Sequence, residues 1–322
     1  MKSLDTKLGR IRAGSQRPED FILAHANDPD VALGVASVPL AGGGFKTRRA
    51  FLDATAEVIR AGSVDVMLTS VANGEQLTLR GLFADSPVTL AIRANDTTDI
   101  WLPRGASYLR EPSRPFRTAS LERVRPFCDL GLYSITLNNI LDRDYATIEA
   151  YARFREEALR LGFRHFLEVF NPNAGAGLSP EAVPAFVNDT IVRLLCGVTA
   201  SERPAFLKLV YNGPRALEEL VSHDPSLVVG ILGGAAGTTR DTFELLAQGV
   251  KHGARLALFG RKINLAESPP DMIALMWQVI RGELGPLEAV RAYHAVLARK
   301  GLRPARAPEA DVQVTERALQ QE

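Results

Sequence analysis

The chain has 322 residues, of which 46% are hydrophobic and 23% are charged, and its formal net charge is +1. This is the composition of an ordinary globular protein. A net charge so close to zero argues against a nucleic acid or an anionic membrane surface as the partner. No apolar stretch approaches the ~20 residues that a membrane-spanning helix needs, so we expect no membrane partner.

The cysteines and the first residues of the chain indicate a cytoplasmic protein, and the histidines indicate that no metal is bound. Cys128 and Cys196 form neither a disulfide framework nor a zinc-binding spacing, which suits a reducing compartment. Residues 1–20 are basic but lack the apolar core of a secretory signal. The five histidines show no ligand spacing, so we expect no metal and no other cofactor.

Apolar runs rich in β-branched residues recur along the whole chain and indicate strands. In chain order they are VALGVASV (31–38), VDVMLTS (64–70), PVTLAIR (87–93), LGLYSITL (130–137), RHFLEVF (164–170), AFLKLVY (205–211), LVVGIL (227–232) and RLALFG (255–260). Amphipathic segments between the runs indicate helices, with clear examples at 47–62, 146–162, 214–221 and 239–253.

Strands that alternate with helices form βαβ units in a parallel sheet. Eight such repeats favour a closed (β/α)8 barrel over an open doubly wound sheet. No GxGxxG motif follows an early strand, which argues against a dinucleotide-binding fold. We therefore predict an α/β protein with a single TIM-barrel domain that spans residues 1–322.

Some stretches lie outside the plain repeat. We expect the barrel core at about 31–270, an N-terminal extension before it, and helices and a polar tail over 271–322. The Pro- and Arg-rich segment 96–120 forms either a long loop over the barrel mouth or a subunit contact. The tail beyond residue 301 is either mobile or draped over the surface. The apolar C-terminal helices and the 96–120 segment favour a homo-oligomer.

A lysine inside one of the apolar runs is the most informative residue of the sequence. Lys208 lies in AFLKLVYNG, and an ammonium group in an apolar core is costly unless it is paired or neutralised. Side chains alternate between the two faces of a barrel strand. Lys208 and Glu168, on what we predict to be neighbouring strands, therefore both point inward at the same end.

Two interpretations fit this pair. A structural Glu–Lys ion pair would close the barrel core, but desolvation makes such pairs poor sources of stability. In the catalytic interpretation, Lys208 attacks a substrate carbonyl to form a Schiff base and Glu168 moves protons as general acid and base. Because perturbed groups cluster at functional sites, we favour the catalytic interpretation.

Other polar residues are placed to line the same mouth. The fourth predicted strand carries Ser134 and Thr136 on one face, and Asn138 continues that face as a candidate substrate contact. Arg93 ends the third predicted strand. It either contacts an anionic group of the substrate or is an ordinary surface arginine.

Glycines follow the last two predicted strands. LGGAAGTTRD comes after the seventh and LFGRKI ends the eighth. Glycine lets backbone N–H groups approach a ligand closely, and these two loops are the usual phosphate site of a (β/α)8 barrel. Gly233, Gly234, Gly260 and Arg261 are therefore candidate phosphate-binding residues. The alternative is that the glycines only make tight turns.

Three segments together resemble the class I aldolase superfamily, which includes deoxyribose-phosphate, archaeal-type fructose-bisphosphate and tagatose-bisphosphate aldolases. They are LKLVYNG around Lys208, ILGGAAG, and GARLALFGRKINLAESP, and the likeness is best over about 160–270. The resemblance implies a (β/α)8 barrel, a Schiff-base lysine at Lys208, an acid at Glu168 and phosphate binding by the last two loops.

The sequence departs from the family pattern at three places. The family often carries an acid at the end of the first strand, and GVASVPLAGGGF has no carboxylate. Phe170 stands where fructose-bisphosphate members often have tyrosine, and Lys262 stands where the phosphate-binding turn usually has asparagine. These differences bear on the general acid and on the substrate, but not on the imine chemistry.

We therefore expect a class I, metal-independent aldolase that acts on a phosphorylated sugar-like carbonyl compound through a lysine Schiff base. Two alternatives remain from the sequence. The same barrel hosts thiolase-like acyl transfer and transaldol reactions, because a fold does not determine a function. The altered first strand also leaves room for a catalytically inactive sugar-phosphate-binding protein.

Overall fold

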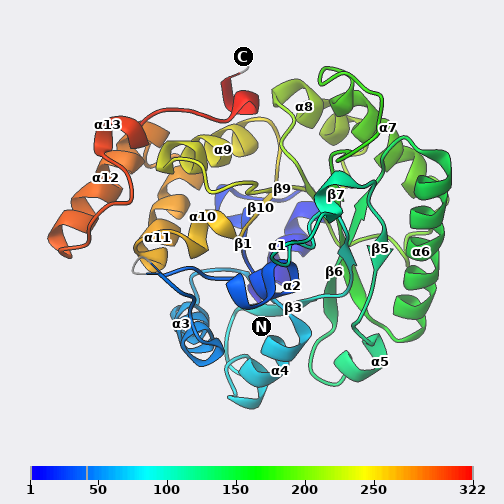
Figure 1. Ribbon diagram of the computed structural model, residues 1–322, viewed down its shortest axis with the longest axis horizontal. Coiled ribbons are helices and arrows are strands. Elements are labelled where there is room, and N and C mark those ends of the chain that lie inside the picture. The colour runs from blue at the N-terminus through cyan, green and yellow to red at the C-terminus, as the bar shows by residue number, and fades with distance from the viewer. Residues whose placement is uncertain (1, 41–42, 321–322) are drawn as a thin grey trace.

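Eight parallel strands close into a barrel in the computed structural model, which describes residues 2–40 and 43–320 (Figure 1). The order around the barrel is β1-β10-β9-β8-β7-β6-β3-β2. The strands are β1 (Ile22–Asn27), β2 (Val66–Thr69), β3 (Thr89–Arg93), β6 (Leu130–Thr136), β7 (Arg164–Phe170), β8 (Leu207–Leu209), β9 (Val229–Leu232) and β10 (Leu256–Phe259). The predicted fold class, an α/β protein with a (β/α)8 barrel, is confirmed.

The predicted position of the first strand, 31–38, is wrong. The chain there forms the short helix α2 (Pro29–Leu33) and a 3₁₀ turn (Gly34–Ala36), and Gly34 has a positive φ of 58°. The first strand is Ile22–Asn27, which pairs with β10 and β2, so the barrel begins before the expected residue 31. The other seven predicted runs each contain a barrel strand.

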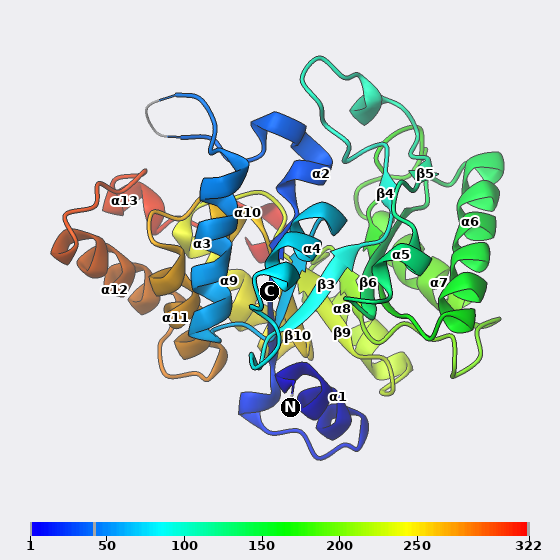
Figure 2. The same cartoon turned by 90° about the horizontal axis from the view of Figure 1, so that it is seen from below.

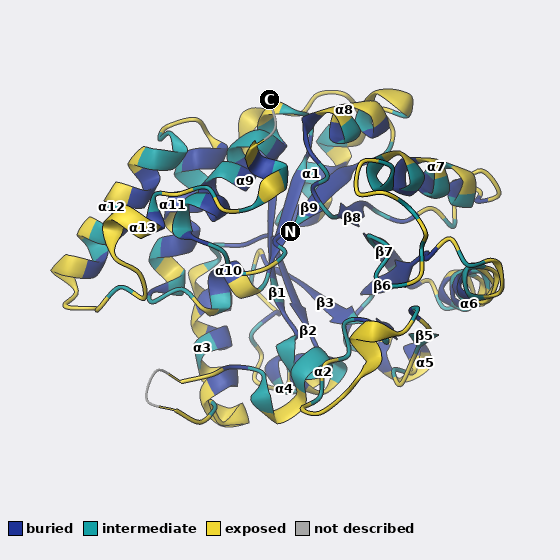
Figure 3. Ribbon diagram, turned by 45° about the horizontal axis from the view of Figure 1, so that its top comes forward, coloured by how far each residue is buried: buried dark blue, intermediate teal, exposed yellow. Residues whose placement is uncertain are grey.

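The strands are buried on both faces, as the dark blue barrel in Figure 3 shows. Inward-facing side chains such as Ala24, Leu68 and Phe166 form one apolar cluster inside the barrel. Outward-facing neighbours such as Leu23 and Leu167 belong to a second, larger cluster between the barrel and the helices. This two-sided burial explains why the strands read as continuous apolar runs rather than as alternating ones.

The helices surround the barrel, and those predicted at 47–62, 146–162, 214–221 and 239–253 are present. Thr47 accepts a hydrogen bond from the backbone N–H of Ala50, and Thr238 and Asp241 form a reciprocal capping box, so two helices begin at side-chain caps. The helices not yet given are α1 (Ser3–Arg12), α3 (Arg48–Ala61), α4 (Val71–Leu79), α5 (Leu121–Val124), α6 (Leu141–Arg160), α7 (Val183–Leu195), α8 (Pro214–His223), α9 (Thr239–Lys251), α10 (Arg261–Asn264), α11 (Pro269–Ile280), α12 (Pro286–Arg299) and α13 (Pro308–Asp311).

The N-terminal extension closes one end of the barrel. Helix α1 lies below the barrel in Figure 2, and its Leu4 and Leu8 are buried in the same cluster as the barrel interior. The ammonium of Lys2 donates to the backbone carbonyls of Phe83, Ser86 and Val88. The N-terminal ends of the strands are therefore covered, and the opposite end is where their carboxyl ends open.

The segment 96–120 projects beside that opposite end (Figure 2). It holds the two-stranded antiparallel sheet of β4 (Asp96–Thr97) and β5 (Pro115–Phe116), and the 3₁₀ turn Tyr108–Arg110. The Trp101 ring stacks on Tyr108 with 5.4 Å between ring centroids. The backbone N–H of Leu102 donates to the carbonyl of Ala32, which joins this loop to the one after β1.

Beyond the barrel, α11 and α12 pack against α9, and the tail then crosses back over α9 (Figure 1). Of the two alternatives for the tail beyond residue 301, the structure shows the one in which it lies over the surface of the protein. Its last described element is the 3₁₀ turn Arg317–Gln320. In the described ranges no helix combines the length and apolarity needed to cross a membrane.

Candidate functional site

Glu168 and Lys208 face each other inside the barrel. The two residues are direct partners in the register between β7 and β8, and the ammonium of Lys208 forms an ion pair with Oε1 of Glu168. Only 2% of Glu168 and 5% of Lys208 is exposed. Two residues earlier in the sequence, the rings of Phe166 and Phe206 stack with centroids 4.4 Å apart. The pair therefore stands on an aromatic floor that water does not reach.

The second carboxylate oxygen of Glu168 has its own partners. Ser134 on β6 donates its hydroxyl to Oε2 at 2.7 Å, and Nη2 of Arg93 lies 3.4 Å from the same oxygen. Arg93 also donates through Nη1 to the Ser134 hydroxyl at 2.9 Å. Glu168 is thus held from two sides, by Lys208 and by Arg93 with Ser134, and this fixes the orientation of its carboxylate.

An acid stands at the end of the first strand, contrary to the expectation that this position lacks a carboxylate. Asp28 directly follows β1, is buried, and accepts a hydrogen bond from Nε of Arg93. The expectation was wrong because it took 31–38 as the strand. The signal in the sequence was the apolar run FILAHAN, whose histidine and asparagine make it read less like a strand than VALGVASV.

Asp96 is another acid beside Arg93, and the sequence did not reveal it either. Its Oδ1 lies 3.6 Å from Nη1 of Arg93 and accepts the backbone N–H of Thr97 at 2.8 Å. Its Oδ2 is buried without a hydrogen-bond partner among the described residues. Burial raises the pKa of Asp96 to about 6, and the nearby Arg93 guanidinium only partly opposes that rise.

Arg93 lies among three carboxylates. Burial acts to lower the pKa of Arg93, but the carboxylates of Asp28, Glu168 and Asp96 outweigh it and leave that pKa above its ordinary value. Arg93 is therefore permanently charged. Lys208 belongs to the same cluster through its ion pair with Glu168. Asp96, whose pKa is raised to about 6, is the carboxylate of this cluster that takes up a proton in mildly acidic solution.

Asn138, a predicted substrate contact, is fully buried at the end of β6. Its side-chain N–H groups donate to Oδ1 of Asn173 at 2.8 Å and to the carbonyl of Ala174 at 3.1 Å. Its Oδ1 accepts the backbone N–H of Ser113 at 3.0 Å. In this structure the amide of Asn138 thus joins the segment 96–120 to the loop after β7.

The predicted phosphate-binding loops lie side by side, since β9 and β10 are neighbours. Gly234 has a positive φ of 63° with open space around its α-carbon, and Gly233 packs on Phe259. A Cβ on Gly260 would stand 2.8 Å from the backbone carbonyl oxygen of Ala26, so only glycine fits between β10 and β1. Arg261 follows with an exposed side chain.

Lys262 points from this turn toward the C-terminal tail. Its Nζ lies 2.7 Å from Oε1 of Glu316 and 3.4 Å from the carbonyl of Ala236, and burial lowers its pKa. The tail is fixed there because Thr315 and Glu316 also donate to Asp241 at the start of α9. A small hollow beside this contact is lined by three cationic and two acidic side chains, namely Arg261, Lys262, Arg306, Glu267 and Asp311.

Within residues 2–40 and 43–320, no group of three or more His, Cys, Asp or Glu side chains is arranged to hold a metal ion. Asp28, Asp96 and Glu168 are instead paired with Arg93 or Lys208. What the arrangement offers chemically is a buried amine, a carboxylate in contact with it, and two further carboxylates nearby. These are the groups that imine formation and proton transfer require.

Comparisons with known proteins agree on the fold. No protein-family model matches the sequence, and no curated protein matches it either. A Schiff-base-forming fructose-1,6-bisphosphate aldolase superposes with a TM-score of 0.63 and 16% identity, over 86% of this chain and 99% of that one. An archaeal fructose-1,6-bisphosphate aldolase gives 0.62 and 17%, over 87% and 99%.

A third solved structure, of a protein from Corynebacterium glutamicum, gives a TM-score of 0.59 and 17% identity, over 87% of this chain and 98% of that one. At these identities the likeness shows the fold alone. The chain shares its barrel fold with these three structures, so the resemblance seen in the sequence extends to the architecture.

Proposed function

We propose that this protein is a class I aldolase, a metal-independent lyase that cleaves or forms a carbon–carbon bond in a phosphorylated sugar-like carbonyl compound. The observation that carries the proposal is the buried ion pair of Lys208 and Glu168 on neighbouring strands inside the barrel. An ion pair is an expensive way to fill a core, whereas a lysine amine is the group that forms an imine with a carbonyl.

Imine formation would use the contact between the two side chains. Lys208 gives a proton to Glu168, and the neutral amine attacks the carbonyl carbon. A proton then passes from the new nitrogen centre to the oxygen, which produces a carbinolamine. Glu168 returns its proton to that hydroxyl, which leaves as water. The resulting iminium cation stays beside the Glu168 carboxylate, and this contact stabilises its charge.

Bond cleavage needs a second base. The iminium accepts the electron pair of the adjacent carbon–carbon bond once the hydroxyl on the departing carbon loses its proton. Asp28 and Asp96 are the carboxylates that we propose for this step, because both belong to the Arg93 network at the barrel mouth. We expected Arg93 to contact an anionic group of the substrate. Its donors instead reach carboxylates and a hydroxyl, and we propose that it positions them.

We propose that the phosphate group binds at the loops after β9 and β10. Backbone N–H groups of Gly233, Gly234 and Gly260 can approach an anion closely, and the exposed guanidinium of Arg261 supplies the charge. Asn138, although fully buried in this structure, remains a proposed substrate contact. A cytoplasmic location and a homo-oligomeric state complete the proposal. The location rests on cysteine usage, and the oligomer on the apolar C-terminal helices.

The proposal is tested by trapping the imine. The full chain is incubated with a panel of phosphorylated ketones and aldehydes, including dihydroxyacetone phosphate, and reduced with borohydride. Mass spectrometry of the digested protein should then locate a substrate adduct on Lys208. The Lys208→Met variant should give none, and Lys251→Met, which removes an exposed lysine on α9, should label like the wild type.

The same experiment separates the alternatives. Labelling of Lys208 with release of two smaller carbonyl products supports the lyase, and transfer of the trapped fragment to a second aldehyde instead indicates a transaldol reaction. An acyl product without a reducible adduct indicates thiolase-like transfer. Saturable binding of a sugar phosphate without any adduct on Lys208 would contradict the imine mechanism and favour a binding protein.

A further inference from the structure

Helix α6, the green helix at the right of Figure 1, exposes large apolar side chains on its outer side. The exposed fractions are 82% for Leu141, 63% for Tyr145, 42% for Ile148 and 50% for Leu159. The other side of the same helix, which includes Tyr151, is buried against the barrel. A helix that is apolar on both sides is normally covered on both, so the outer side requires a partner.

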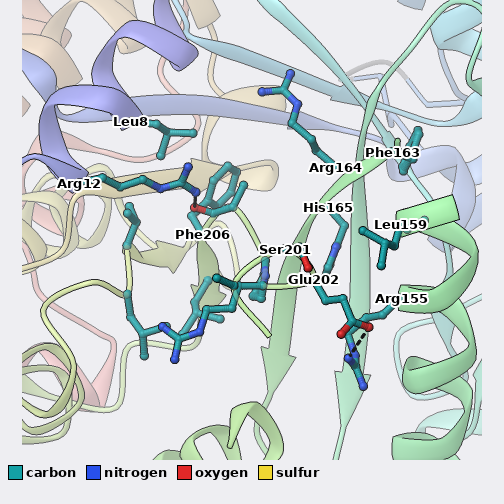
Figure 4. Close-up of a pocket in the computed structure, with 18 of the residues that line it drawn as sticks. Leu8, Arg12, Arg155, Leu159, Phe163, Arg164, His165, Ser201, Glu202 and Phe206 are labelled. Atoms are coloured by element: carbon teal, nitrogen blue, oxygen red, sulfur yellow. Dashed lines mark hydrogen bonds and ion pairs between the residues drawn. The ribbon is translucent and has the colours of Figure 1, made fainter. Parts of the chain in front are cut away.

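These exposed residues, with Ala152 between them, form what we call the α6 stripe. Positions 141, 145, 148, 152 and 159 follow the alternating steps of four and three along which two helices pack. The position missing from this series holds Arg155, which turns aside and pairs with Glu202 at 3.1 Å (Figure 4). The spacing therefore fits another helix as the cover of the stripe.

A row of exposed charges borders the α6 stripe on one side. At 3.6 residues per turn, Asp142 and Glu149 fall on this side in the first half of the helix, and Arg153 and Arg160 in the second half. Glu156 is the one acid of the second half. Glu149 and Arg153 pair with each other at 3.3 Å, but both remain exposed, and a pair of this kind contributes little. The row is thus acidic at one end and mainly basic at the other.

A second copy of α6 that runs in the opposite direction matches this row. A two-fold axis perpendicular to the helix places the charged border of one copy against the same border of the other. Asp142 then faces Arg160 of the second copy, and Glu149 faces its Arg153, with each contact made twice. A parallel pair would instead bring the row against the opposite border, where Arg155 is already paired with Glu202.

The surface beside the row extends this contact. A helix of 20 residues is about 30 Å long, and a stable interface covers about 800 Å² on each partner, which is more than one helix provides. The segment 96–120 lies along the same border, because its Arg117 pairs at 2.6 Å with Glu157, one turn after Arg153. A second copy that covers the charged row therefore reaches this segment as well.

We propose that this protein forms a two-fold dimer in which the α6 stripes of two copies pack antiparallel and the segment 96–120 completes the interface. The inference rests on the homo-oligomer named in the proposed function and assigns its surface. That surface is not the C-terminal helices, of which α11 and α12 already pack against α9. The dimer does not depend on the aldolase reaction.

The mass of the full chain in solution tests the apolar part of this interface. Sedimentation equilibrium at micromolar concentration should give twice the 35.0 kDa of one chain. Leu141→Gln combined with Tyr145→Gln should raise the dissociation constant of the dimer by at least about tenfold. Both side chains are exposed, and circular dichroism checks that the variant is folded. As the control, Leu79→Gln removes a leucine of α4 that is 75% exposed and should leave the dimer unchanged.

Charge reversal tests the antiparallel arrangement. Asp142→Arg with Glu149→Arg makes the row basic apart from Glu156, and Arg153→Glu with Arg160→Glu makes it wholly acidic. Each double variant alone should dimerise at least about tenfold more weakly than the wild type, because like charges then face each other. Mixed together, the two should form a heterodimer, which native mass spectrometry identifies by its mass.

The outcomes are distinguishable from those of the imine trapping. A monomeric wild type overturns the inference and the proposed homo-oligomer, but not the lyase reaction. A dimer that persists unchanged in the Leu141 and Tyr145 variant overturns the assignment of α6. If mixing the two charge variants restores no dimer, the antiparallel arrangement is wrong.

Discussion

Two buried lysines, Lys208 and Lys262, are each paired with a glutamate, but in different ways. Only 5% of Lys208 and 3% of Lys262 is exposed. The partner of Lys208 is Glu168, on the neighbouring barrel strand, with 2% of its side chain exposed. The partner of Lys262 is Glu316 in the C-terminal tail, with 29% exposed. The two lysines therefore differ in their partners rather than in their burial, because Glu168 belongs to a buried network with Ser134 and Arg93 whereas water reaches Glu316.

Substitution of each lysine by methionine tests this comparison most strongly. Lys208→Met removes the proposed nucleophile, so turnover of any substrate found in the trapping screen should fall at least about 1000-fold. Lys262→Met leaves the mouth intact, so kcat should be nearly unchanged and KM should rise less than about tenfold. Steady-state kinetics measures both. Equal losses in kcat would remove the distinction between the two lysines.

The two glutamates should differ in stability. Glu168→Gln leaves Lys208 and Arg93 without their shared carboxylate in a dry core, which should lower the free energy of unfolding by about 3–5 kcal/mol. Glu316→Gln affects a partner that water already reaches, and a loss of about 1 kcal/mol is expected. Urea unfolding followed by circular dichroism gives both values. Similar losses would mean that the tail pair is as tightly held as the barrel pair.

Asp96 makes the mouth sensitive to pH. Because its pKa is about 6 in the folded protein, against an ordinary value of 3.8, the folded state keeps a proton that the unfolded state releases between about pH 4 and pH 6. Asp96 therefore costs stability as the pH rises through that window. Asp96→Asn removes this cost and keeps the hydrogen bond from Thr97.

We expect the free energy of unfolding of Asp96→Asn to exceed that of the wild type by an amount that grows from pH 4 to pH 6. At higher pH the difference should stay constant. It should reach at most about 3 kcal/mol. Urea unfolding of both proteins at several pH values measures it. A difference that does not change with pH would show that Asp96 titrates normally in the folded protein.

Glycines in the loops after β9 and β10 should give effects of about 2 kcal/mol or less. In Gly260→Ala the new Cβ would stand 2.8 Å from the carbonyl oxygen of Ala26, so β10 and β1 must separate, at a cost of about 2 kcal/mol. Gly234→Ala meets open space but keeps a φ of 63°, which costs about 1 kcal/mol. Thermal unfolding compares the two variants. The reverse order would mean that the β9 loop, not the β10 turn, is the rigid one.

Much of the fold could be predicted because the barrel repeats one local pattern. Strands buried on both faces produce apolar runs, and amphipathic helices separate them, so β2, β3 and the later strands lie where the runs indicated. The first strand could not be found in this way. Ile22–Asn27 contains a histidine and an asparagine, and only its pairing with β10 and β2 makes it a barrel strand.

The sequence by itself determined the pairing of Glu168 with Lys208. Alternation along two consecutive strands places both side chains inward, and the structure shows that the two residues are partners in the register. It could not reveal Asp28, Asp96 or the contacts of Arg93. Those depend on closure of the barrel, which brings the ends of β1, β3 and β7 together across its axis. Likewise, no local pattern predicts that Glu316 reaches Lys262, because these distant residues come together only when the tail packs against α9.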